Sequence, residues 1–236
     1  MIGEPTTGGA LLTSDDNMVA ERAAIPVHDD LTIARVLEED IIFGRLAPGT
    51  RLTEDALLSR FAVTRHFARQ ALVQLEAMGI VTRERNKGAT VRSLTPREVK
   101  EIYEVRELLQ RQAALWIPLP APQDLIDKLM VIHEEHGRCV AEGYLRGVHE
   151  ANDRFHLTMF GACGNQQLVK TIEVYMRLTL PVRANSMADA ESLRISHEHH
   201  RLMIEMLKGD DNWVLAQLCV DHLQPSKKRY LDRIAS

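Results

Sequence analysis

The chain has 236 residues, with 29 Lys and Arg against 33 Asp and Glu, so its formal net charge is −4. Apolar residues make up 45% and charged residues 26%, a balance that is usual for globular proteins and excludes a chain disordered throughout. Aromatic residues make up only 5%, so the core must be mainly aliphatic, which favours helices over a β-sandwich.

The sequence predicts a protein of a reducing compartment without a membrane anchor. No apolar stretch approaches the roughly 18–20 residues of a membrane span, and the N-terminus lacks the basic-then-apolar order of a secretory signal. Cys139, Cys163 and Cys219 are odd in number and widely separated, which indicates reduced thiols rather than a disulfide framework or a cysteine zinc site. We therefore expect a cytoplasmic protein.

The N-terminal 30 residues differ in composition from the rest of the chain. Residues 1–30 carry one basic and six acidic residues and show no sustained periodicity, which predicts a flexible tail. From Leu31 onward, apolar residues fall mostly on one helical face, and we expect that helix to stop before Gly44.

Two further helices and a hairpin come next along the chain. Thr53 is placed to cap a short helix over 54–60, and Thr64 to cap another that runs to about Met78. Two β-prone runs, 80–82 and 89–91, flank the turn formed by residues 86–88, which predicts a hairpin. Three helices followed by a small hairpin are the layout of a winged helix-turn-helix, here over residues 31–94.

Residues 95–236 are expected to form a second, all-helical domain. Thr95, Pro96 and Glu98 combine a capping threonine, a proline at the first helical position and a glutamate three residues after the cap. Beyond them the pattern predicts a bundle of six or seven helices, with spans near 96–116, 122–142, 145–162, 165–184, 190–208 and 212–231. The expected fold is thus mainly α, with an N-terminal winged domain.

The net charge conceals a basic segment. The stretch 60–97 has a net charge of +6, whereas residues 98–236 have −3. It carries two glutamates and eight basic residues, which are Arg60, Arg65, Arg69, Arg83, Arg85, Lys87, Arg92 and Arg97. A basic segment that coincides with a helix-turn-helix pattern is the electrostatic signature of duplex DNA binding.

The position of these residues predicts how DNA would be read. Arg65 and Arg69 share one face at the start of the third helix, where a recognition helix reaches base edges, and either can pair with guanine O6 and N7. Thr64 and the helix N-terminus suit phosphate oxygens. Lys87 and Gly88, at the hairpin tip, are placed to follow the backbone into the minor groove.

These residues lie within motifs that resemble the GntR family of transcriptional regulators. The motifs are GRLAPGTRLTE at 44–54, VTR at 63–65, RQAL at 69–72, LEAMGIV at 75–81 and NKGATV at 86–91. The resemblance covers residues 31–94 and implies DNA contacts from Arg51, Thr64, Arg65, Arg69, Lys87 and Gly88. One departure is His66-Phe67-Ala68, where the family often has a Pro-Val pair.

Four residues of the second domain have the spacing of a metal site. Asn152 and His156 are four residues apart on one predicted helix, His200 lies within another, and His222 is on the expected antiparallel partner. Three imidazoles that converge in a bundle, with one oxygen donor, can bind Zn²⁺, Ni²⁺ or a similar divalent ion. The alternative is that they are isolated core or surface residues, as we expect for His133, His136, His149, His197 and His199.

A second resemblance concerns this region. YEVR at 103–106, NDRFH at 152–156, GN at 164–165 and the His200/His222 pair resemble the FadR-type effector domain, also called FCD. The resemblance implies a ligand-binding domain. Many members of that family bind a metal through three histidines and an Asp or Asn four residues before the first of them. The matching positions in this chain are Asn152, His156, His200 and His222. Several members have Asp at the position of Asn152, and a neutral amide is the weaker ligand.

A bound cation would attract a small organic acid as effector. Arg106, Arg177 and Arg183 are our candidates for clamping its carboxylate, and surface or interhelical salt bridges are the alternative explanation for each.

Three functions are compatible with these patterns, and a ligand-responsive regulator is favoured. It would bind a palindromic DNA operator as a homodimer and act as a repressor, with no catalytic residues. The second is a metal-dependent hydrolase that uses His156, His200 and His222, but no general base is placed for it, because His133 and His136 are too close for a His-Glu-x-x-His motif. The third is a helical interaction module that does not bind DNA.

Overall fold

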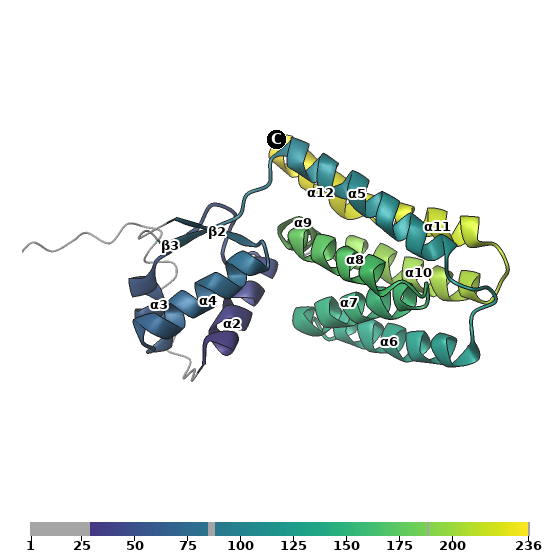
Figure 1. Ribbon diagram of the computed structural model, residues 1–236, viewed down its shortest axis with the longest axis horizontal. Helices are drawn as coiled ribbons and strands as arrows, with labels where there is room; N and C mark the ends of the chain where they lie inside the picture. Colours follow the sequence, from purple (N-terminus) through teal and green to yellow (C-terminus); the bar gives the residue numbers. More distant parts are fainter. Residues whose placement is uncertain (1–28, 85–87, 188, 236) are drawn as a thin grey trace, which may run out of the picture.

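The structure is a computed structural model that describes residues 29–84, 88–187 and 189–235. Its N-terminal part consists of three helices and a small sheet: α2 (Asp30–Ile42), β1 (Arg51–Leu52), α3 (Glu54–Phe61), α4 (Arg65–Ala77), β2 (Val81–Glu84) and β3 (Gly88–Val91). This is the expected winged helix-turn-helix, and it lies to one side of a helical body in Figure 1. The tail predicted for the first 30 residues lies outside the described residues as far as residue 28.

The two predicted helix caps differ. The Thr53 hydroxyl accepts a hydrogen bond from the Ala56 backbone N–H at 3.2 Å, so the expected cap of α3 is present. Thr64 occupies the N-cap position of α4 but makes no capping hydrogen bond through its side chain, and that prediction is wrong. Its exposed side chain therefore remains available at the start of the recognition helix.

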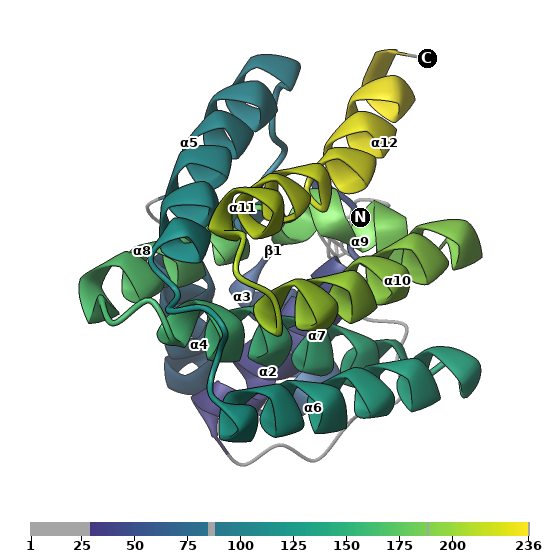
Figure 2. The same ribbon diagram turned by 90° about the vertical axis from the view of Figure 1, so that its right-hand side faces the viewer.

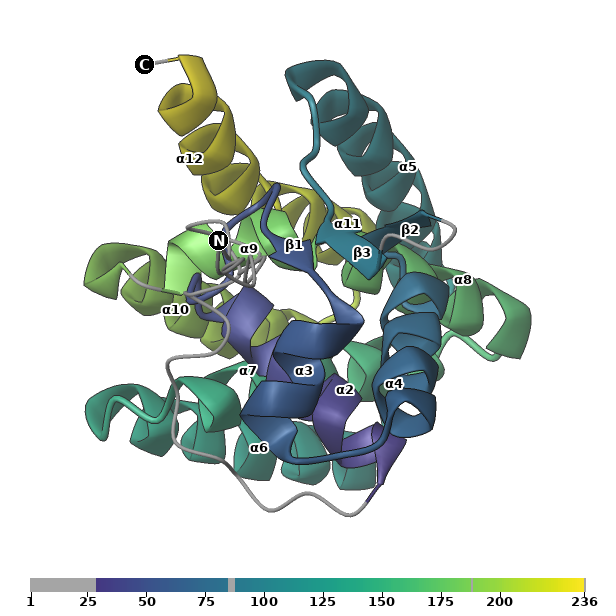
Figure 3. The ribbon, with the colours of Figure 1, turned by 90° about the vertical axis from the view of Figure 1, so that its left-hand side faces the viewer.

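The sheet of the winged part contains one strand more than the predicted hairpin. Within the described residues its strand order is β1-β3-β2, all antiparallel, with Arg51 opposite Thr90 and Thr82 opposite Thr90 on the other side. Figure 3 shows β1 against β3 at the edge of the wing. The two residues of β1 carry no alternation pattern, which is why the sequence did not predict this strand.

The C-terminal part is all helical, which confirms the expected fold class. Its elements are α5 (Pro96–Leu115), α6 (Gln123–Ala141), α7 (Leu145–Gly161), α8 (Gln166–Leu178), α9 (Leu180–Met187), α10 (Ala190–Leu207), α11 (Asn212–Asp221) and α12 (Gln224–Ala235). The predicted capping box begins α5: Thr95 accepts from the Glu98 N–H at 3.2 Å, and Glu98 accepts from the Thr95 N–H at 2.9 Å. Figure 2 shows α5, α11 and α12 above α10 and α7, with α6 below.

Eight helices stand in the described part of this body because two predicted helices are each divided. The span 165–184 breaks at Thr179 and the span 212–231 at His222, and in both cases a proline lies close behind, Pro181 or Pro225. Proline lacks the N–H that would continue a helix but fits the first turn of a new one. The Thr179 hydroxyl accepts from Arg106 Nη1 at 2.8 Å, which ties this break to α5.

The winged part and the helical body are packed together. Leu180 of α9 belongs to the same buried cluster as Leu37, Leu72 and Ile80 of the winged part. Leu178 also lies so close to Gly79 that a Cβ there would be 2.6 Å from its Cδ2. Two ion pairs, Arg35 with Glu150 and Arg146 with Glu39, also join α2 to α7.

Candidate functional site

The recognition-helix arginines lie on the outer face of the winged part. The side chains of Arg65 and Arg69 are 62% and 58% exposed, and Thr64 is exposed beside them. Figure 3 shows α3 and α4 on the face turned away from the helical body. Arg51 is exposed in β1, next to the wing. The structure thus brings four of the six predicted DNA-contacting residues to one outward region.

The other two predicted residues belong to the wing. Lys87 lies outside the described residues. Gly88 adopts a φ of +85° in β3, and a Cβ at this position would be 2.3 Å from the Leu52 carbonyl oxygen. Close approach of β1 therefore explains the glycine without DNA, and its contact with the minor groove stays a prediction.

Two acids of α3 hold the arginines of α4. Arg69 donates from Nε to Glu54 Oε1 at 2.9 Å and from Nη2 to Glu54 Oε2 at 3.2 Å. Arg65 donates from Nη2 to Asp55 Oδ1 at 2.7 Å. The hydrogen bond from Arg69 lowers the pKa of Glu54, which therefore stays ionised. Sequence reasoning did not identify these partners, because residues 10 and 15 positions apart on two helices leave no periodic signal.

Three histidines converge in the helical body. His156 Nε2 lies 3.0 Å from His222 Nε2 and 3.2 Å from His200 Nε2, and their rings are inclined to one another by 49° and 77°. In the described part of the chain these are the three side chains that meet the geometry of a metal cluster. Nitrogens bound to one tetrahedral ion at 2.0–2.1 Å lie about 3.3 Å apart, so the spacing fits a Zn²⁺-like site.

The chemistry of this triad also fits a cation. His156 and His200 are buried, and burial lowers the pKa of His156 to about 3 and that of His200 and His222 well below its usual value. Three neutral imidazoles that direct Nε2 at one another leave lone pairs in mutual repulsion unless a proton or an ion lies between them. The three Nε2 atoms face one another, so Nε2 would be the ligating atom of each histidine, while the buried Nδ1 atoms lack a hydrogen-bond partner within the described structure.

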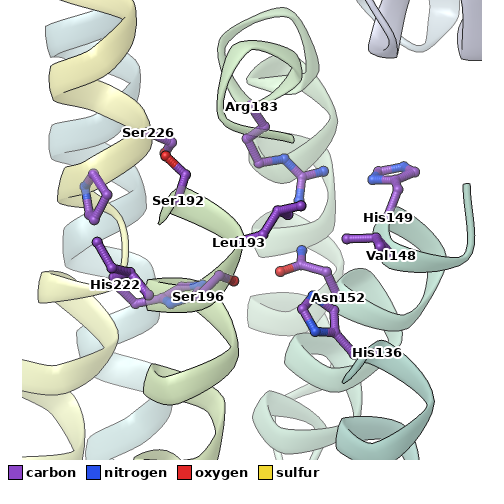
Figure 4. A pocket seen from close by; sticks show the side chains of 12 residues that line it. His136, Val148, His149, Asn152, Arg183, Ser192, Leu193, Ser196, His222 and Ser226 are labelled. Carbon is purple, nitrogen blue, oxygen red and sulfur yellow. The ribbon is translucent and has the colours of Figure 1, made fainter. Parts of the chain in front are cut away.

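Asn152 and Asp153 are oriented differently. Asn152 donates from Nδ2 to Asp153 Oδ1 at 3.0 Å, which turns its amide oxygen toward the interior of the pocket in Figure 4. Burial of Asp153 opposes its ionisation, but Arg183 and then His149 lower its pKa well below the usual value. Asp153 therefore pairs with Arg183, and it is the amide oxygen of Asn152 that faces the pocket.

A pocket that is partly open to solvent adjoins these residues. Val148, Leu193, Ile195 and Pro225 form its apolar lining. The polar lining consists of His136, His149, Asn152, Arg183, Ser192, Ser196, His222 and Ser226 (Figure 4). A small polar ligand in this pocket would meet a guanidinium, an amide and several hydroxyl groups, which suits an organic anion.

The three predicted effector-binding arginines occupy different places. Arg183 of α9 lines the pocket and makes a bidentate contact with Asp153, at 2.7 and 3.3 Å. Arg106 is buried outside the pocket lining, and burial lowers its pKa to about 10. Arg177 pairs with Glu173 on its own helix at 2.5 Å. The structure therefore brings only Arg183 of these three to the pocket within the described residues.

Two histidines that were expected to be isolated line the pocket. His136 and His149 are both partly or fully buried there. His136 Nδ1 lies 3.3 Å from His197 Nδ1, with the ring planes only 7° apart and the centroids 5.6 Å apart. Rings that meet edge to edge in this way share a hydrogen bond and do not converge on an ion. Neither histidine gave a sequence signal for a place in the pocket, because each lies within a helix whose rotation the sequence leaves open.

The winged head and the helical body with its pocket define a DNA-binding transcriptional regulator with a second, ligand-binding domain. Residues 30–91 match "Bacterial regulatory proteins, gntR family" and residues 101–225 match "FCD domain". The chain belongs to the GntR family and carries an FCD domain. None of the described helices is long and apolar enough to cross a bilayer.

Curated relatives of similar length agree with this assignment. The chain is 27% identical over 190 residues to the Nta operon transcriptional regulator of Aminobacter aminovorans, covering 79% of this chain and 87% of that protein. It is 24% identical over 200 residues to the HTH-type transcriptional repressor GlaR of Escherichia coli, covering 80% and 90%. The relatives are regulators, and the chain is a regulator and not an enzyme, so the hydrolase alternative is not supported.

Solved structures share the fold. The protein resembles E. coli McbR/YncC with a TM-score of 0.67 and 22% identity, covering 89% of this chain and 100% of that one. A GntR regulator from Rhodococcus sp. RHA1 gives a TM-score of 0.69 and 22% identity, covering 86% and 97%. At this identity the likeness establishes the fold of both parts and says nothing about which ligand is bound.

Proposed function

We propose that this protein is a ligand-responsive repressor that binds a palindromic operator as a homodimer and senses a small organic acid at a divalent metal. The observation that carries this proposal is the convergence of His156, His200 and His222 beside a pocket that contains Arg183. We assign residues 31–94 to DNA binding and residues 95–236 to effector binding and dimerisation.

DNA binding would use the outward face of α4. Arg65 and Arg69 lie at its N-terminal end, where residues of a recognition helix reach base edges in the major groove. Thr64 and Arg51 would contact phosphates, and Lys87 and Gly88 would follow the backbone at the wing. The repressor GlaR, a relative that covers most of this chain, supports the sign of regulation.

Dimerisation would use an exposed apolar surface on α5 and α11. Leu108 of α5 and Trp116, the residue that caps the C-terminal end of α5, have exposures of 68% and 49%. Trp213 of α11, 69% exposed, adjoins Trp116 across a shallow depression. Large exposed apolar side chains that adjoin one another mark protein interfaces. A two-fold dimer would present two recognition helices to a palindromic site.

The metal would be held by His156, His200 and His222, with the Asn152 oxygen as fourth donor. Zn²⁺ and Ni²⁺ both accept this set, since imidazole nitrogen is a borderline ligand. A bound ion acts as a Lewis acid for a carboxylate. Arg183 would bind the same carboxylate through its guanidinium, and the apolar side of the pocket would receive the rest of the acid.

Titration with metal and acid tests this function. Purified protein, stripped of metal, is screened by thermal shift with Zn²⁺ or Ni²⁺ and a panel of small organic acids, and a hit is then added to an operator mobility-shift assay. We expect stabilisation by metal, further stabilisation by one class of acid, and weaker operator binding in its presence. Operator binding that no acid changes, in metal-loaded protein, would refute the effector proposal.

A further inference from the structure

Glu54 and Asp55 are acids in the part of the chain that faces DNA. Both lie in the first turn of α3, where acidic residues favour the helix dipole. Their carboxylates nevertheless reach across to α4 and bond Arg69 and Arg65. Glu54 is also 3.8 Å from Arg65 Nη1, so it contacts both arginines. The helix dipole alone does not require these contacts.

The geometry of the Arg69–Glu54 pair leaves the base-reading atoms accessible. A guanidinium carries five N–H groups in a rigid fork, and the carboxylate occupies the edge formed by Nε and Nη2. Nη1 takes no part in this bidentate contact. Recognition of guanine needs two parallel N–H groups, which the Nη1 and Nη2 end of the fork supplies. Glu54 therefore fixes the plane of the guanidinium without using the end that would read the base.

Glu54 is well placed to impose that orientation. Its side chain is 22% exposed, whereas that of Arg69 is 58% exposed, so the acid is the anchored partner and the arginine the mobile one. The preceding residue, Thr53, is fixed as the cap of α3. Ordering of a long side chain before binding lowers the entropy lost when it meets its partner.

The carboxylates of Glu54 and Asp55 also lower the affinity for non-specific DNA. Phosphates attract free arginines at any sequence, and this term dominates non-specific affinity. Acids beside the arginines repel phosphates and compete for the guanidinium, which weakens binding wherever no guanine compensates. Specificity is a difference between two affinities, and it grows when the unwanted complex is weakened.

We propose that Glu54 is a specificity-determining positioning residue that orients Arg69 toward guanine, and that Glu54 and Asp55 together suppress binding to other sequences. This inference rests on the proposed contact of Arg65 and Arg69 with base edges.

The test compares affinity for two DNA duplexes of equal length. One is the sequence that the wild-type protein enriches from a random pool, and the other is a scrambled duplex. Dissociation constants are measured for wild type, Glu54→Asp, Glu54→Gln, Asp55→Asn and Arg69→Ala. Glu76→Gln is the control, since it removes an acid of the same domain that pairs with Arg83 instead. Circular dichroism establishes that each variant is folded.

We expect the ratio of enriched to scrambled affinity to fall about tenfold or more in Glu54→Gln, with tighter binding to the scrambled duplex. Glu54→Asp keeps the charge but shortens the reach, so its ratio should fall as well. Glu76→Gln should keep the wild-type ratio within about twofold. A wild-type ratio in both Glu54 variants overturns the inference. If Arg69→Ala also keeps that ratio, the proposed base contact fails too; if Arg69→Ala lowers it, only the role of Glu54 is refuted.

Discussion

Arg183 and Asp153 form a bidentate ion pair that lies between the pocket and the DNA-binding head. Arg183 lines the pocket, and its Nη1 is 2.7 Å from Asp153 Oδ1. Glu38 of α2 faces the same pair: burial and then the charge of Asp153 raise the pKa of Glu38, while Arg177 and Arg183 oppose this. A carboxylate bound by Arg183 would compete with Asp153 and leave two acids facing each other across the contact between the head and the body.

Replacement of Glu38 by Gln should therefore weaken the effect that effector binding has on operator affinity. The amide keeps the size of the side chain but removes the charge that Asp153 would repel. Allosteric coupling is usually 5–150-fold in affinity, and we expect the effect of the acid on operator binding to shrink to about twofold. Operator affinity without the acid should change little, because α2 carries none of the proposed DNA contacts. Mobility shift with and without the acid measures both.

Glu191→Gln is the control for this variant. It removes a carboxylate from an exposed ion pair with Arg194 on α10 and leaves the charges around Glu38 in place. A full effector response in Glu38→Gln would show that the signal reaches the head by another route, such as the packing of Leu178 against Gly79.

Local sequence signals predicted the elements better than the contacts between them. The capping box at Thr95 fixed the start of α5, and the spacing of His156, His200 and His222, together with the FCD resemblance, predicted a cluster that the structure brings together. These signals depend on neighbours along the chain or on one helix face.

The relation of Arg183 to Asp153 and Glu38 could not be predicted in that way. It depends on the rotation of α2, α7 and α9 about their axes, and a helix that is covered on several sides carries no single apolar face to fix that rotation. The breaks before Pro181 and Pro225 were missed for a different reason, because helical periodicity continues across both and only the missing N–H interrupts it.

Asn152→Asp should strengthen metal binding. The structure turns the amide oxygen of Asn152 toward the pocket, so a carboxylate there would add a negative charge to the three neutral imidazoles. We expect affinity for Ni²⁺ or Zn²⁺ to rise about tenfold, or roughly 1.4 kcal/mol. Isothermal titration of metal-free protein measures it. His222→Ala should abolish high-affinity binding.

Asp153→Asn is the matched control, since it replaces a carboxylate by an amide at the neighbouring residue, the opposite of the change in Asn152→Asp. Asp153 is engaged by Arg183, so its loss should disturb the pocket and leave metal affinity within a few-fold of wild type. Equal effects at the two positions would contradict the assignment of Asn152 as the fourth ligand.

A fall in pH from 6.5 to 5 should destabilise the metal-free protein. Burial lowers the pKa of His156 to about 3 and that of His136 to about 4, from 6.5. Below pH 6.5 the unfolded chain binds protons that the folded protein does not, so stability falls with falling pH, by about 1.4 kcal/mol per pH unit for each histidine. Urea unfolding at pH 7, 6 and 5 measures the slope.

The variant His136→Gln should reduce that slope, because it removes one of the buried histidines with a lowered pKa. An unchanged slope in His136→Gln would indicate that this histidine is protonated in the folded protein at pH 5 to 6.

Leu108→Asp should weaken the proposed dimer. Leu108 is 68% exposed on α5, so the change should cost little in the folded monomer but would bury a carboxylate in the proposed interface. We expect the dissociation constant of the dimer to rise about 30-fold or more, as for a central interface residue. Sedimentation velocity over a concentration series measures it.

Val131→Asp on α6, at 64% exposure, is the control, because it adds the same charge to a different surface. Operator affinity should fall in Leu108→Asp and not in Val131→Asp, because a monomer binds a single half-site. If the dimer dissociation constant rises equally in the two variants, the interface lies elsewhere.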